Sequence, residues 1–343
     1  MVVLDEKNKI ADFAAAHELH VALGYFDGLH LGHQTLLDYV LQAAGEKGGQ
    51  AGVLLIEPHP LKILRGNGGI RNLNTLEDKI RLIQAYGDIH VFILPFDREF
   101  AGLSPEAFVR DYLAGLLQIR TAACGFNYSF GKGGAGKSET LCRLGEIYGF
   151  SCGILPKITY KGKTVSSTEI RRFIEKGHMK EACSLLGHSH IYTGKVIGGN
   201  KLGTRLGFPT ANLELNQELT WPAYGVYGGF VQEEDGSIHR AVINAGIRPT
   251  VKQEDKKPSF EANLINFSGD LYGKTLRVAL TDRLRPEKTF ADLDGLRRQI
   301  AIDEKYAIEA LNSWQADLEK KYKTIETIFS YDKDFYHHLP VPR

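Results

Sequence analysis

Short apolar runs alternate with helical patterns through the first half of the chain. In the helical segments, apolar residues recur every three or four positions, as they do on one face of a helix. Strands that alternate with helices predict a doubly wound parallel sheet with helices on both faces. The predicted strands are Leu19–Tyr25, Ala51–Ile56, Ile89–Leu94, Thr121–Phe126 and Cys152–Leu155, and the predicted helices are Gln34–Ala44, Leu76–Tyr86, Pro105–Leu117 and Glu139–Tyr148.

The pattern changes after a further helical segment, Thr168–Leu186. Strand-like runs separated by Gly, Pro, Asn and Asp then predict an antiparallel barrel or sandwich, and a helix is expected from Asp292 to about Ile328. We expect a domain boundary near Gly187–His190, and therefore domains of residues 1–186 and 187–320 before a helical end and tail, 321–343. The predicted strands of the second half are Ile191–Ile197, Val226–Gln232, Ala241–Asn244, Glu261–Phe267 and Thr275–Thr281.

Composition narrows the class of protein. The 343 residues allow two domains, and the formal net charge of +1 argues against a nucleic-acid partner. Met1–Asp12 lacks an apolar run of signal-peptide length, and no stretch approaches the roughly 20 apolar residues of a membrane span. We therefore expect a cytoplasmic protein without a membrane partner, a monomer or weak homo-oligomer. The cysteines form no C-x-x-C pair and predict reduced, mostly buried thiols, at Cys124, Cys142, Cys152 and Cys183.

A glycine-rich turn with two histidines lies between the first predicted strand and helix. It reads Gly24-Tyr25-Phe26-Asp27-Gly28-Leu29-His30-Leu31-Gly32-His33. Ligands of doubly wound sheets bind at the carboxyl ends of strands, where glycines admit phosphate and a helix N-terminus attracts it. His30 and His33 can donate hydrogen bonds to triphosphate oxygens, as nucleotidyl transfer requires. The alternatives are ordinary turn residues, or two metal ligands that lack an evident third.

A second candidate anion site opens a later helix. In Val165-Ser166-Ser167-Thr168-Glu169-Ile170-Arg171 the hydroxyls lie at the helix N-terminus, and Arg171 adds a planar charged fork. A plain N-cap with exposed basic residues is the alternative. His59, in the Glu57-Pro58-His59-Pro60 turn, is expected to face the same edge of the sheet.

The segment Gly131–Ser138 fits the G-x-x-x-x-G-K-S pattern of a P-loop. A P-loop requires a buried strand directly before its first glycine, whereas Phe126–Phe130 has the character of a loop. We therefore favour a glycine-rich flap beside a nucleotide site, with Asn127 as a polar contact to base or flavin.

The second half of the chain holds another candidate site. Glycines recur every four residues from Gly199 through Gly203 to Gly207, and Pro209 fixes the turn before Thr210 and Asn212. These two side chains point the same way on an extended segment and offer hard oxygens to Mg²⁺. Strand alternation places Glu261 on a polar face, where its carboxylate could accept a proton from an attacking hydroxyl. A glycine-rich hairpin and an exposed strand glutamate are the alternatives. Arg285 lies in a further polar turn, Leu284–Glu287.

Together these motifs resemble the bifunctional riboflavin kinase/FAD synthetase family of prokaryotes. The likeness runs from about Leu19 to Asp303 and rests on the ordered set G-x-F-D-G-x-H-x-G-H, P-H-P, S-S-T-x-I-R, G-F-P-T-A-N, N-x-G-x-R-P-T and G-D-L-Y-G. Three positions depart from the usual pattern: Thr204 follows Gly203 in place of arginine, Asn266 replaces an acid, and His178 follows Gly177 in place of aspartate.

The resemblance implies a Rossmann-like nucleotidyltransferase domain followed by a six-stranded riboflavin kinase barrel with a terminal helix. It implies two uses of ATP, one to phosphorylate riboflavin to FMN and one to adenylylate FMN to FAD with release of pyrophosphate. In the kinase, Thr210 and Asn212 are implied to hold Mg²⁺ and ATP phosphates, and Glu261 to be the base for the ribityl hydroxyl. The residues implied to bind ATP for adenylyl transfer are His30, His33, Ser166, Ser167, Thr168 and Arg171. His59 and Asn127 are implied to line the same site. The other expected binding residues are Gly24, Phe26, Asp27, Gly28, Gly203, Gly207, Pro209 and Arg285.

Three other functions compete with this interpretation. The nearest is an FAD synthetase whose barrel is inactive or only binds flavin, against which the presence of Thr210, Asn212 and Glu261 argues. A different nucleotidyltransferase with an unrelated second domain would need no G-F-P-T-A-N segment. A flavin-binding regulator would release no pyrophosphate from ATP.

Overall fold

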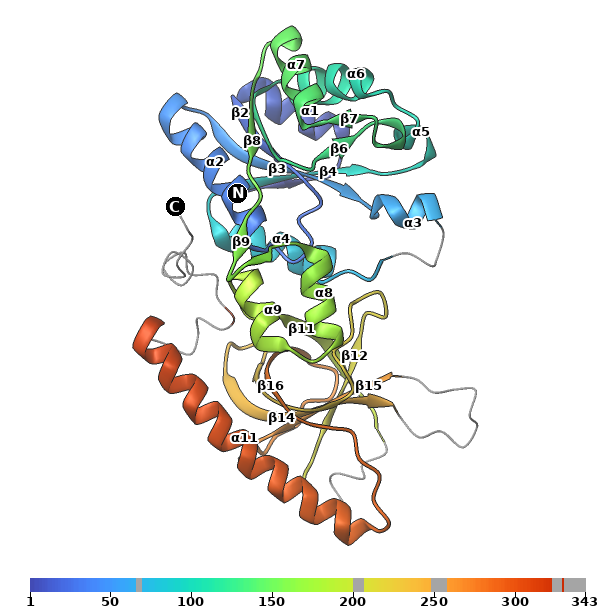
Figure 1. Ribbon diagram of the computed structural model, residues 1–343, viewed down its shortest axis with the longest axis vertical. Coiled ribbons are helices and arrows are strands. Elements are labelled where there is room, and N and C mark those ends of the chain that lie inside the picture. The colour runs from blue at the N-terminus through green and yellow to red at the C-terminus, as the bar shows by residue number, and fades with distance from the viewer. Residues whose placement is uncertain (66–69, 200–206, 248–257, 323–328, 330–343) are drawn as a thin grey trace. The chain divides into compact units, whose positions relative to one another are not determined.

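The contacts of the chain divide it into two units. The computed structural model describes residues 1–65, 70–199, 207–247, 258–322 and 329, and its first unit consists of Met1–Arg71 and Lys79–Ser166. The second unit consists of Asn72–Asp78 and the described residues from Ser167 onward. In Figure 1 the parallel sheet of the first unit is blue to green and the barrel strands of the second are yellow to orange. The domain boundary expected near Gly187–His190 stays a prediction.

The first unit contains a six-stranded parallel sheet in the order β1-β4-β3-β2-β5-β8. The chain passes from β2 to β3 and β4 on one side and later to β5 and β8 on the other, so the strand order reverses beside β2. The five predicted strands are confirmed, whereas two-residue β1 was not expected. The bounds are β1 Val3–Leu4, β2 Leu19–Leu23, β3 Gln50–Glu57, β4 Ile89–Pro95, β5 Ile119–Gly125 and β8 Ser151–Leu155, with a small hairpin of β9 Thr159–Tyr160 and β10 Lys163–Thr164.

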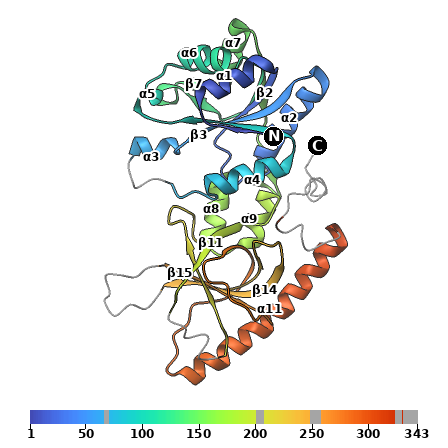
Figure 2. The same ribbon diagram turned by 180° about the vertical axis from the view of Figure 1, so that it is seen from behind.

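Helices cover both faces of this sheet, as Figures 1 and 2 show. Helix α2 packs on β2, β3 and β5, whereas α1, α6, η1 and α7 share one apolar cluster with β2 and β5. The predicted doubly wound arrangement is therefore confirmed. The helix bounds are α1 Lys7–Ala16, α2 Leu31–Lys47, α3 Pro60–Arg65, α4 Leu76–Tyr86, α5 Arg98–Ala101, α6 Pro105–Phe108, the π-helical η1 Val109–Leu116 and α7 Ser138–Tyr148.

The glycine-rich segment forms a hairpin and not a P-loop. Strands β6 (Ser129–Phe130) and β7 (Gly136–Lys137) pair antiparallel around a short 3₁₀ turn, η2 (Lys132–Gly134). The Ser138 hydroxyl, which opens α7, donates to the Phe126 carbonyl at 3.1 Å. The parallel strand β5 ends at Gly125, and the strand that directly precedes Gly131 is the two-residue hairpin strand β6, so no strand of the parallel sheet runs into the glycines as a P-loop requires.

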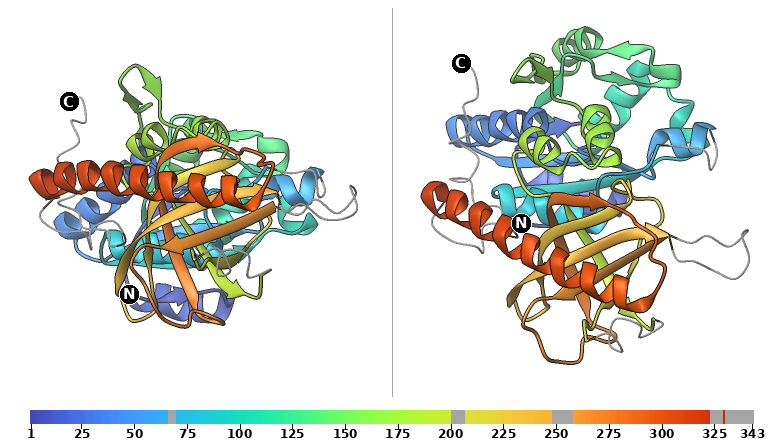
Figure 3. Two further views of the ribbon diagram at one scale, coloured as in Figure 1. Left: turned by 90° about the horizontal axis from the view of Figure 1, so that it is seen from below. Right: turned by 60° about the horizontal axis from the view of Figure 1, so that its bottom comes forward.

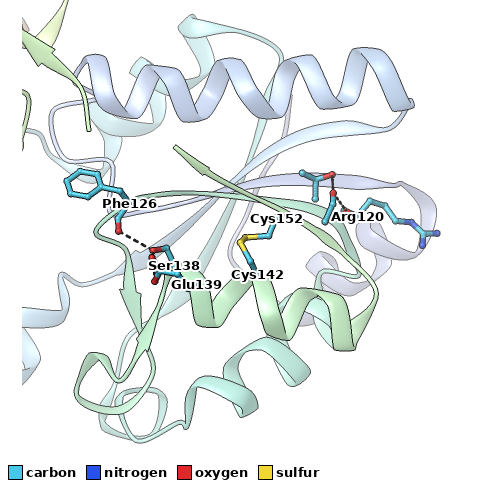
Figure 4. Close-up of a disulfide and its surroundings, with 8 residues drawn as sticks. Arg120, Phe126, Ser138, Glu139, Cys142 and Cys152 are labelled. Atoms are coloured by element: carbon cyan, nitrogen blue, oxygen red, sulfur yellow. Dashed lines mark hydrogen bonds between the residues drawn. A yellow bond between two sulfur atoms is a disulfide. The ribbon is translucent and has the colours of Figure 1, made fainter. Parts of the chain in front are cut away.

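One sequence expectation is wrong: Cys142 and Cys152 are joined by a disulfide and are not reduced thiols. Figure 4 shows the bond linking helix α7 to strand β8. Helix α7 ends at Gly149, whose φ of 85° reverses the chain, and β8 follows at once, so the two Cα atoms come within 5.0 Å. The prediction rested on the expected cellular compartment and on the spacing of the cysteines in the sequence. Neither indicates that the chain reverses direction between Cys142 and Cys152. Cys124 and Cys183 are free thiols, as expected.

The second unit is built on a closed antiparallel barrel, in the order β11-β12-β15-β14-β13-β16. The predicted barrel is confirmed, and β12 is the strand that the sequence pattern showed only as an extended segment. Closure pairs β11 with β16 and leaves no sheet edge unpaired. The bounds are β11 Ile191–Ile197, β12 Ala211–Leu215, β13 Gly225–Gln232, β14 Ile238–Ile247, β15 Pro258–Leu264 and β16 Thr275–Pro286.

Helix α11 (Leu293–Tyr322) lies along the outside of the barrel, as both views in Figure 3 show. Ala307 and Leu311 of this helix share an apolar cluster with Val226, Phe230 and Val242. The side chains of β13 and β14 that alternate with these residues therefore face the barrel interior.

Three further segments pack in the second unit. Helices α8 (Ser167–Glu175) and α9 (Met179–Leu186) form a pair, and the Ile174 carbonyl of α8 accepts from the Ala223 amide at 3.1 Å. From early in the chain, Asn72 exchanges backbone hydrogen bonds of 2.8 Å with Glu218 and Thr220.

Candidate active sites

Three loops of the first unit leave the carboxyl ends of adjacent parallel strands. Gly24–His30 follows β2, His59 follows β3 and Asn127 follows β5, and β2 is paired with both of the other strands. The strand order reverses at β2, and such a switch point is where open α/β sheets bind ligands. The structure thus brings these three sequence-predicted segments to one edge of the sheet.

His30 caps helix α2. Its Nδ1 accepts a hydrogen bond from the His33 amide at 3.3 Å, which fixes the proton of a neutral His30 ring on Nε2. The His30 ring stacks on the His33 ring, with centroids 3.7 Å apart and planes 9° apart. His30 Nε2 is therefore the ring nitrogen that carries the proton, and the ring lies at a helix N-terminus, where anions are favoured.

His33 is held as a neutral imidazole. Its Nδ1 is enclosed and has no hydrogen-bond partner in the described parts of the chain. Enclosure, then the neighbouring His30 and Lys79, lower the pKa of His33 well below its usual value of 6.5. Its positive charge is therefore absent at neutral pH, and the ring can act only through polar or stacking contacts.

The residues between the glycines of this turn shape its backbone. Phe26 and Leu29, both fully buried, have φ values of 54° and 37°, a conformation that bulky residues rarely adopt. Gly28 has a φ of 81°, and Asp27 is 1% exposed. Phe26 packs on His33 with ring centroids 5.0 Å apart. Strain of this kind gathers at binding sites, where the surrounding structure maintains it.

Sequence reasoning missed a buried lysine behind this edge. Lys79 of α4 is 1% exposed, and its Nζ lies 2.7 Å from Glu57 Oε1 and 3.7 Å from the centroid of the Tyr25 ring. Helical periodicity contained a signal, because Lys79 precedes the buried Leu82 and Ile83 by three and four positions. Burial, only partly offset by Glu57, lowers the pKa of Lys79 from its usual value of 10.5.

The hydroxyl segment opens helix α8, as predicted. Ser166 and Ser167 are half-buried and Thr168 is exposed, whereas Glu169 forms an ion pair with Arg172. The division of the chain falls between Ser166 and Ser167. That Ser166, Ser167, Thr168 and Arg171 share a site with the two histidines stays a prediction.

A row of side chains crosses five barrel strands on the outer face. Asn212 of β12 lies opposite Glu261 of β15, Glu261 lies opposite Asn244 of β14, and this pairing continues through β13 to β16. Residues opposite one another in antiparallel strands project to the same face. We call this set the transverse row; its members are Asn212, Glu261, Asn244, Val226 and Arg285.

The start of β12 is fixed to the adjacent strand. Asn263, two positions beyond Glu261 and on its face, donates from Nδ2 to the Pro209 carbonyl at 2.7 Å. This bond sets the turn before Thr210, which is half-buried, while Asn212 is 8% exposed. Gly207, with a φ of 89°, precedes this turn. The predicted Gly203 and the neighbouring Thr204 lie outside the described residues.

Arg285 is bound by helix α11. Its Nε and Nη2 donate to the two carboxylate oxygens of Asp303 at 2.8 and 2.7 Å, and Gln299 donates to the same carboxylate at 2.9 Å. Asp303 is 3% exposed, so this is a partly buried bidentate pair. The guanidinium predicted to contact the cofactor thus also connects the transverse row to the helix.

Asn266, which departs from the usual acid, lies at a position with an unusual backbone conformation. It has a φ of 57° in the turn directly after β15. Asparagine is among the few non-glycine residues that tolerate this left-handed conformation. His178, the other described departure, is the N-cap position of α9, and its ring packs edge-on against Phe173 at 6.3 Å.

Comparisons with known proteins match both halves of the chain. The FAD synthetase family matches residues 12–169 and the riboflavin kinase family matches residues 186–311. The bifunctional riboflavin kinase/FMN adenylyltransferase of Bacillus subtilis (strain 168) is 36% identical over 84% of this chain and 91% of its own length. The Escherichia coli (strain K12) protein of the same description is 34% identical over 84% of this chain and 91% of its own length. A Streptococcus pneumoniae crystal structure, described as a macrolide-efflux protein, has a TM-score of 0.79 at 28% identity and covers 90% of this chain and 99% of that one.

The parallel sheet and the barrel, each matched by the model of one enzyme family, define an ATP-dependent transferase with two catalytic domains. The chain belongs to the bifunctional riboflavin kinase/FMN adenylyltransferase family. It phosphorylates riboflavin to FMN and adenylylates FMN to FAD, with ATP as co-substrate and release of pyrophosphate in the second step. Across the described residues, no helix has the length and apolar character to cross a membrane.

Proposed function

We propose that adenylyl transfer occurs at the sheet edge beside β2 and that phosphorylation occurs at the transverse row. The observation that supports the first assignment is the His30 cap of α2, which holds the His30 ring at a helix N-terminus beside the end of β2. The observation that supports the second is the direct pairing of Asn212 with Glu261. Each places the residue types that its reaction needs at adjoining positions.

In the kinase step, the neutral 5′-hydroxyl of riboflavin attacks the γ-phosphorus of ATP and ADP leaves. Glu261 accepts the hydroxyl proton as the new O–P bond forms. The Thr210 hydroxyl and the Asn212 side-chain carbonyl are hard oxygen donors of the type that Mg²⁺ prefers, so the donor set fits this ion. We assign Thr210 and Asn212 to Mg²⁺, which when bound neutralises charge on the ATP phosphates. Gly207 and Pro209 shape the backbone before them.

In the adenylyl step, a phosphate oxygen of FMN attacks the α-phosphorus of ATP and pyrophosphate leaves. The nucleophile is already an anion, so this step needs no general base and no covalent enzyme intermediate. The protein must instead offset repulsion and stabilise the charge that grows on the leaving group. His30 Nε2 and the α2 N-terminus are assigned to that task, and the adjoining His33 ring stays neutral.

The remaining predicted residues are assigned to ligand binding. His59 and Asn127 line the sheet edge, and Gly24, Phe26, Asp27 and Gly28 give the turn its shape. We assign the hydroxyls of Ser166, Ser167 and Thr168, with Arg171, to phosphate oxygens of ATP. We also assign Arg285 to cofactor binding, with its guanidinium held in place by the Asp303 pair.

We further propose a cytoplasmic enzyme that is a monomer or weak homo-oligomer, with an adenylyltransferase domain of residues 1–186 and a kinase domain of residues 187–320. The use of ATP in both reactions supports that location. Disulfides are uncommon in reducing compartments, so the thiol state of Cys142 and Cys152 in cell extracts tests it.

The deciding experiment separates the two sites by product chromatography. Wild type, Glu261→Gln and His30→Ala are each incubated with ATP and Mg²⁺, first with riboflavin and then with FMN. We expect E261Q to make FAD only from supplied FMN, and H30A to stop at FMN. Equal loss of both products in either variant would contradict the assignment of that residue. Wild-type FAD formation from FMN but not from riboflavin would mean that the barrel is an inactive kinase.

A further inference from the structure

Lys79 holds together two strand ends at the adenylyl-transfer edge. Glu57, the last residue of β3, accepts from Lys79 on Oε1 at 2.7 Å and from the Tyr25 hydroxyl on Oε2 at 3.4 Å. The ammonium also lies 3.7 Å from the centroid of the Tyr25 ring, and Tyr25 follows β2 directly. Since β2 and β3 are neighbours, one buried cation fixes the side chains that leave both strands.

The arrangement continues to a residue assigned to ligand binding. The His59 ring packs edge-on against the Tyr25 ring, with centroids 4.1 Å apart. Tyr25 is thereby held between the lysine and the histidine. A shift of Lys79 or Glu57 would release Tyr25 and with it the position of His59.

Charged groups from three further elements interact with Lys79 or with the histidine pair. Lys79 interacts electrostatically with Glu57 of β3, Asp27 of the glycine-rich turn and Lys62 of α3. His33, from α2, interacts with Lys79 and with His30. The lysine therefore adds to the positive field at the site and disfavours a second positive charge on His33.

Packing alone does not account for this ion pair. An apolar pair of similar volume generally stabilises a protein interior as well as a buried ion pair does, because removing charges from water is costly. Here the Lys79 ammonium contacts the Tyr25 ring, which packs against His59, and Lys79 also interacts with His33. The ion pair is largely buried, since the Glu57 side chain is 18% exposed and the Lys79 side chain 1%. A role in the site explains the charges where packing does not.

We propose that Lys79 is a positioning residue for adenylyl transfer, which acts through Glu57 and Tyr25 on His59 and keeps the histidine pair in its working arrangement. It touches no substrate in this scheme. The proposal rests on the assignment of adenylyl transfer to the edge beside β2.

The test compares Lys79→Met with the double variant Lys79→Met/Glu57→Gln. K79M alone leaves a carboxylate without its partner and should lower stability. The double variant removes both charges at nearly constant volume and should recover the melting temperature. We expect it still to form FAD about 10- to 100-fold more slowly than wild type, with kcat reduced more than KM changes, because misplaced groups fail mainly in the transition state. Its riboflavin kinase activity should equal that of wild type.

A matched control is available in the second unit. Lys274 pairs with the buried Glu233 at 2.8 Å, and neither residue is assigned to adenylyl transfer. Lys274→Met should leave the rate of FAD formation unchanged.

A second readout is the His33 ring followed by NMR, which should take up a proton at higher pH in K79M because one cause of its low pKa is gone.

The possible results distinguish the role of Lys79 from the assignment of adenylyl transfer to the edge beside β2. Full recovery of both stability and FAD formation in the double variant would show that the pair is only structural and overturn the proposal. Recovered stability with slow FAD formation and normal FMN formation would support it. If His30→Ala leaves FAD formation intact, the site assignment itself fails, whatever the Lys79 variants do.

Discussion

Glu261 lies directly opposite Asn212 in the ladder between β15 and β12, with Asn244 on its other side in β14. The carboxylate and the two amides are thus fixed by backbone pairing and not by a flexible loop. The base that we propose takes the proton of the riboflavin hydroxyl, and the Mg²⁺ ligand that we propose acts on the ATP phosphates; the two need a fixed spacing, since small misplacements are costly to rate.

Replacing Glu261 by Gln should lower FMN formation by about 10²- to 10⁴-fold, the usual contribution of a general base. The amide keeps the size of the side chain but cannot take the hydroxyl proton. Initial rates with riboflavin and ATP measure the loss, and FAD formation from FMN should persist. The matched control is Glu214→Gln, which changes an exposed glutamate on β12 and should keep full kinase activity.

Replacing His30 by Ala should lower FAD formation by about 10²-fold, the effect of one donor to a charge that develops in the transition state. Pyrophosphate release with FMN as substrate measures it. His17→Ala, an exposed histidine bonded to the Phe13 carbonyl, should have no effect. A similar fall in FMN formation by H30A would point to misfolding and not to a lost donor.

Removing the disulfide should destabilise the first unit. Its cysteines are 10 residues apart, and a loop of this size corresponds to about 2–3 kcal/mol of stabilisation in the chain-entropy account. Urea unfolding of Cys142→Ser/Cys152→Ser should show this loss. Dithiothreitol should bring wild type to the same level and leave the double variant where it was. A variant as stable as oxidised wild type would contradict the expectation.

His190 should make the barrel unit sensitive to acid. It is 0% exposed, neither ring nitrogen has a partner among the residues described, and burial, with His188 adding, lowers its pKa to about 3. The unfolded chain binds a proton near pH 6.5, so between about pH 6.5 and 3 it binds more protons than the folded state. Stability conferred by neutral His190 is present above this window and falls as pH decreases through it.

The loss attributable to His190 between pH 7 and 5 is about 2 kcal/mol. His190→Phe removes the titrating group and keeps a side chain of similar size. Between pH 7 and 5 the unfolding free energy of this variant should therefore fall by about 2 kcal/mol less than that of wild type. Urea titrations at both pH values, read from the transition of the barrel unit, measure the difference. His178→Phe, at an exposed histidine of the same unit, should follow wild type.

Most of the fold could be predicted from the pattern of apolar residues in the sequence. All five residues of β2 are buried, and such a run identifies a strand whatever it pairs with. Two-residue β1 gave no such pattern. Strand β12 was hidden because Asn212 and Pro209 resemble turn residues, although pairing with β15 makes the segment from Ala211 a strand.

The site residues divide in the same way. His30 and Glu261 were found from local motifs, since their chemistry is evident from neighbouring residues in the sequence. Lys79 and the Cys142–Cys152 bond depend on which elements pack together, and that information is not contained in local spacing. The Asn212–Glu261 pair was found as two separate residues, because the ladder register that joins them is a property of the closed barrel.

The early segment Asn72–Asp78 completes its hydrogen bonds with residues that follow it by more than a hundred positions, including Thr193, whose hydroxyl donates to Asp78 at 3.0 Å. A ribosome therefore releases this segment well before its partners exist. An amino-terminal fragment ending at residue 186 would retain the segment and leave Asn72 and Asp78 without those partners. Cutting the enzyme into halves that fold separately thus requires this segment to be redesigned and not merely a choice of cleavage point.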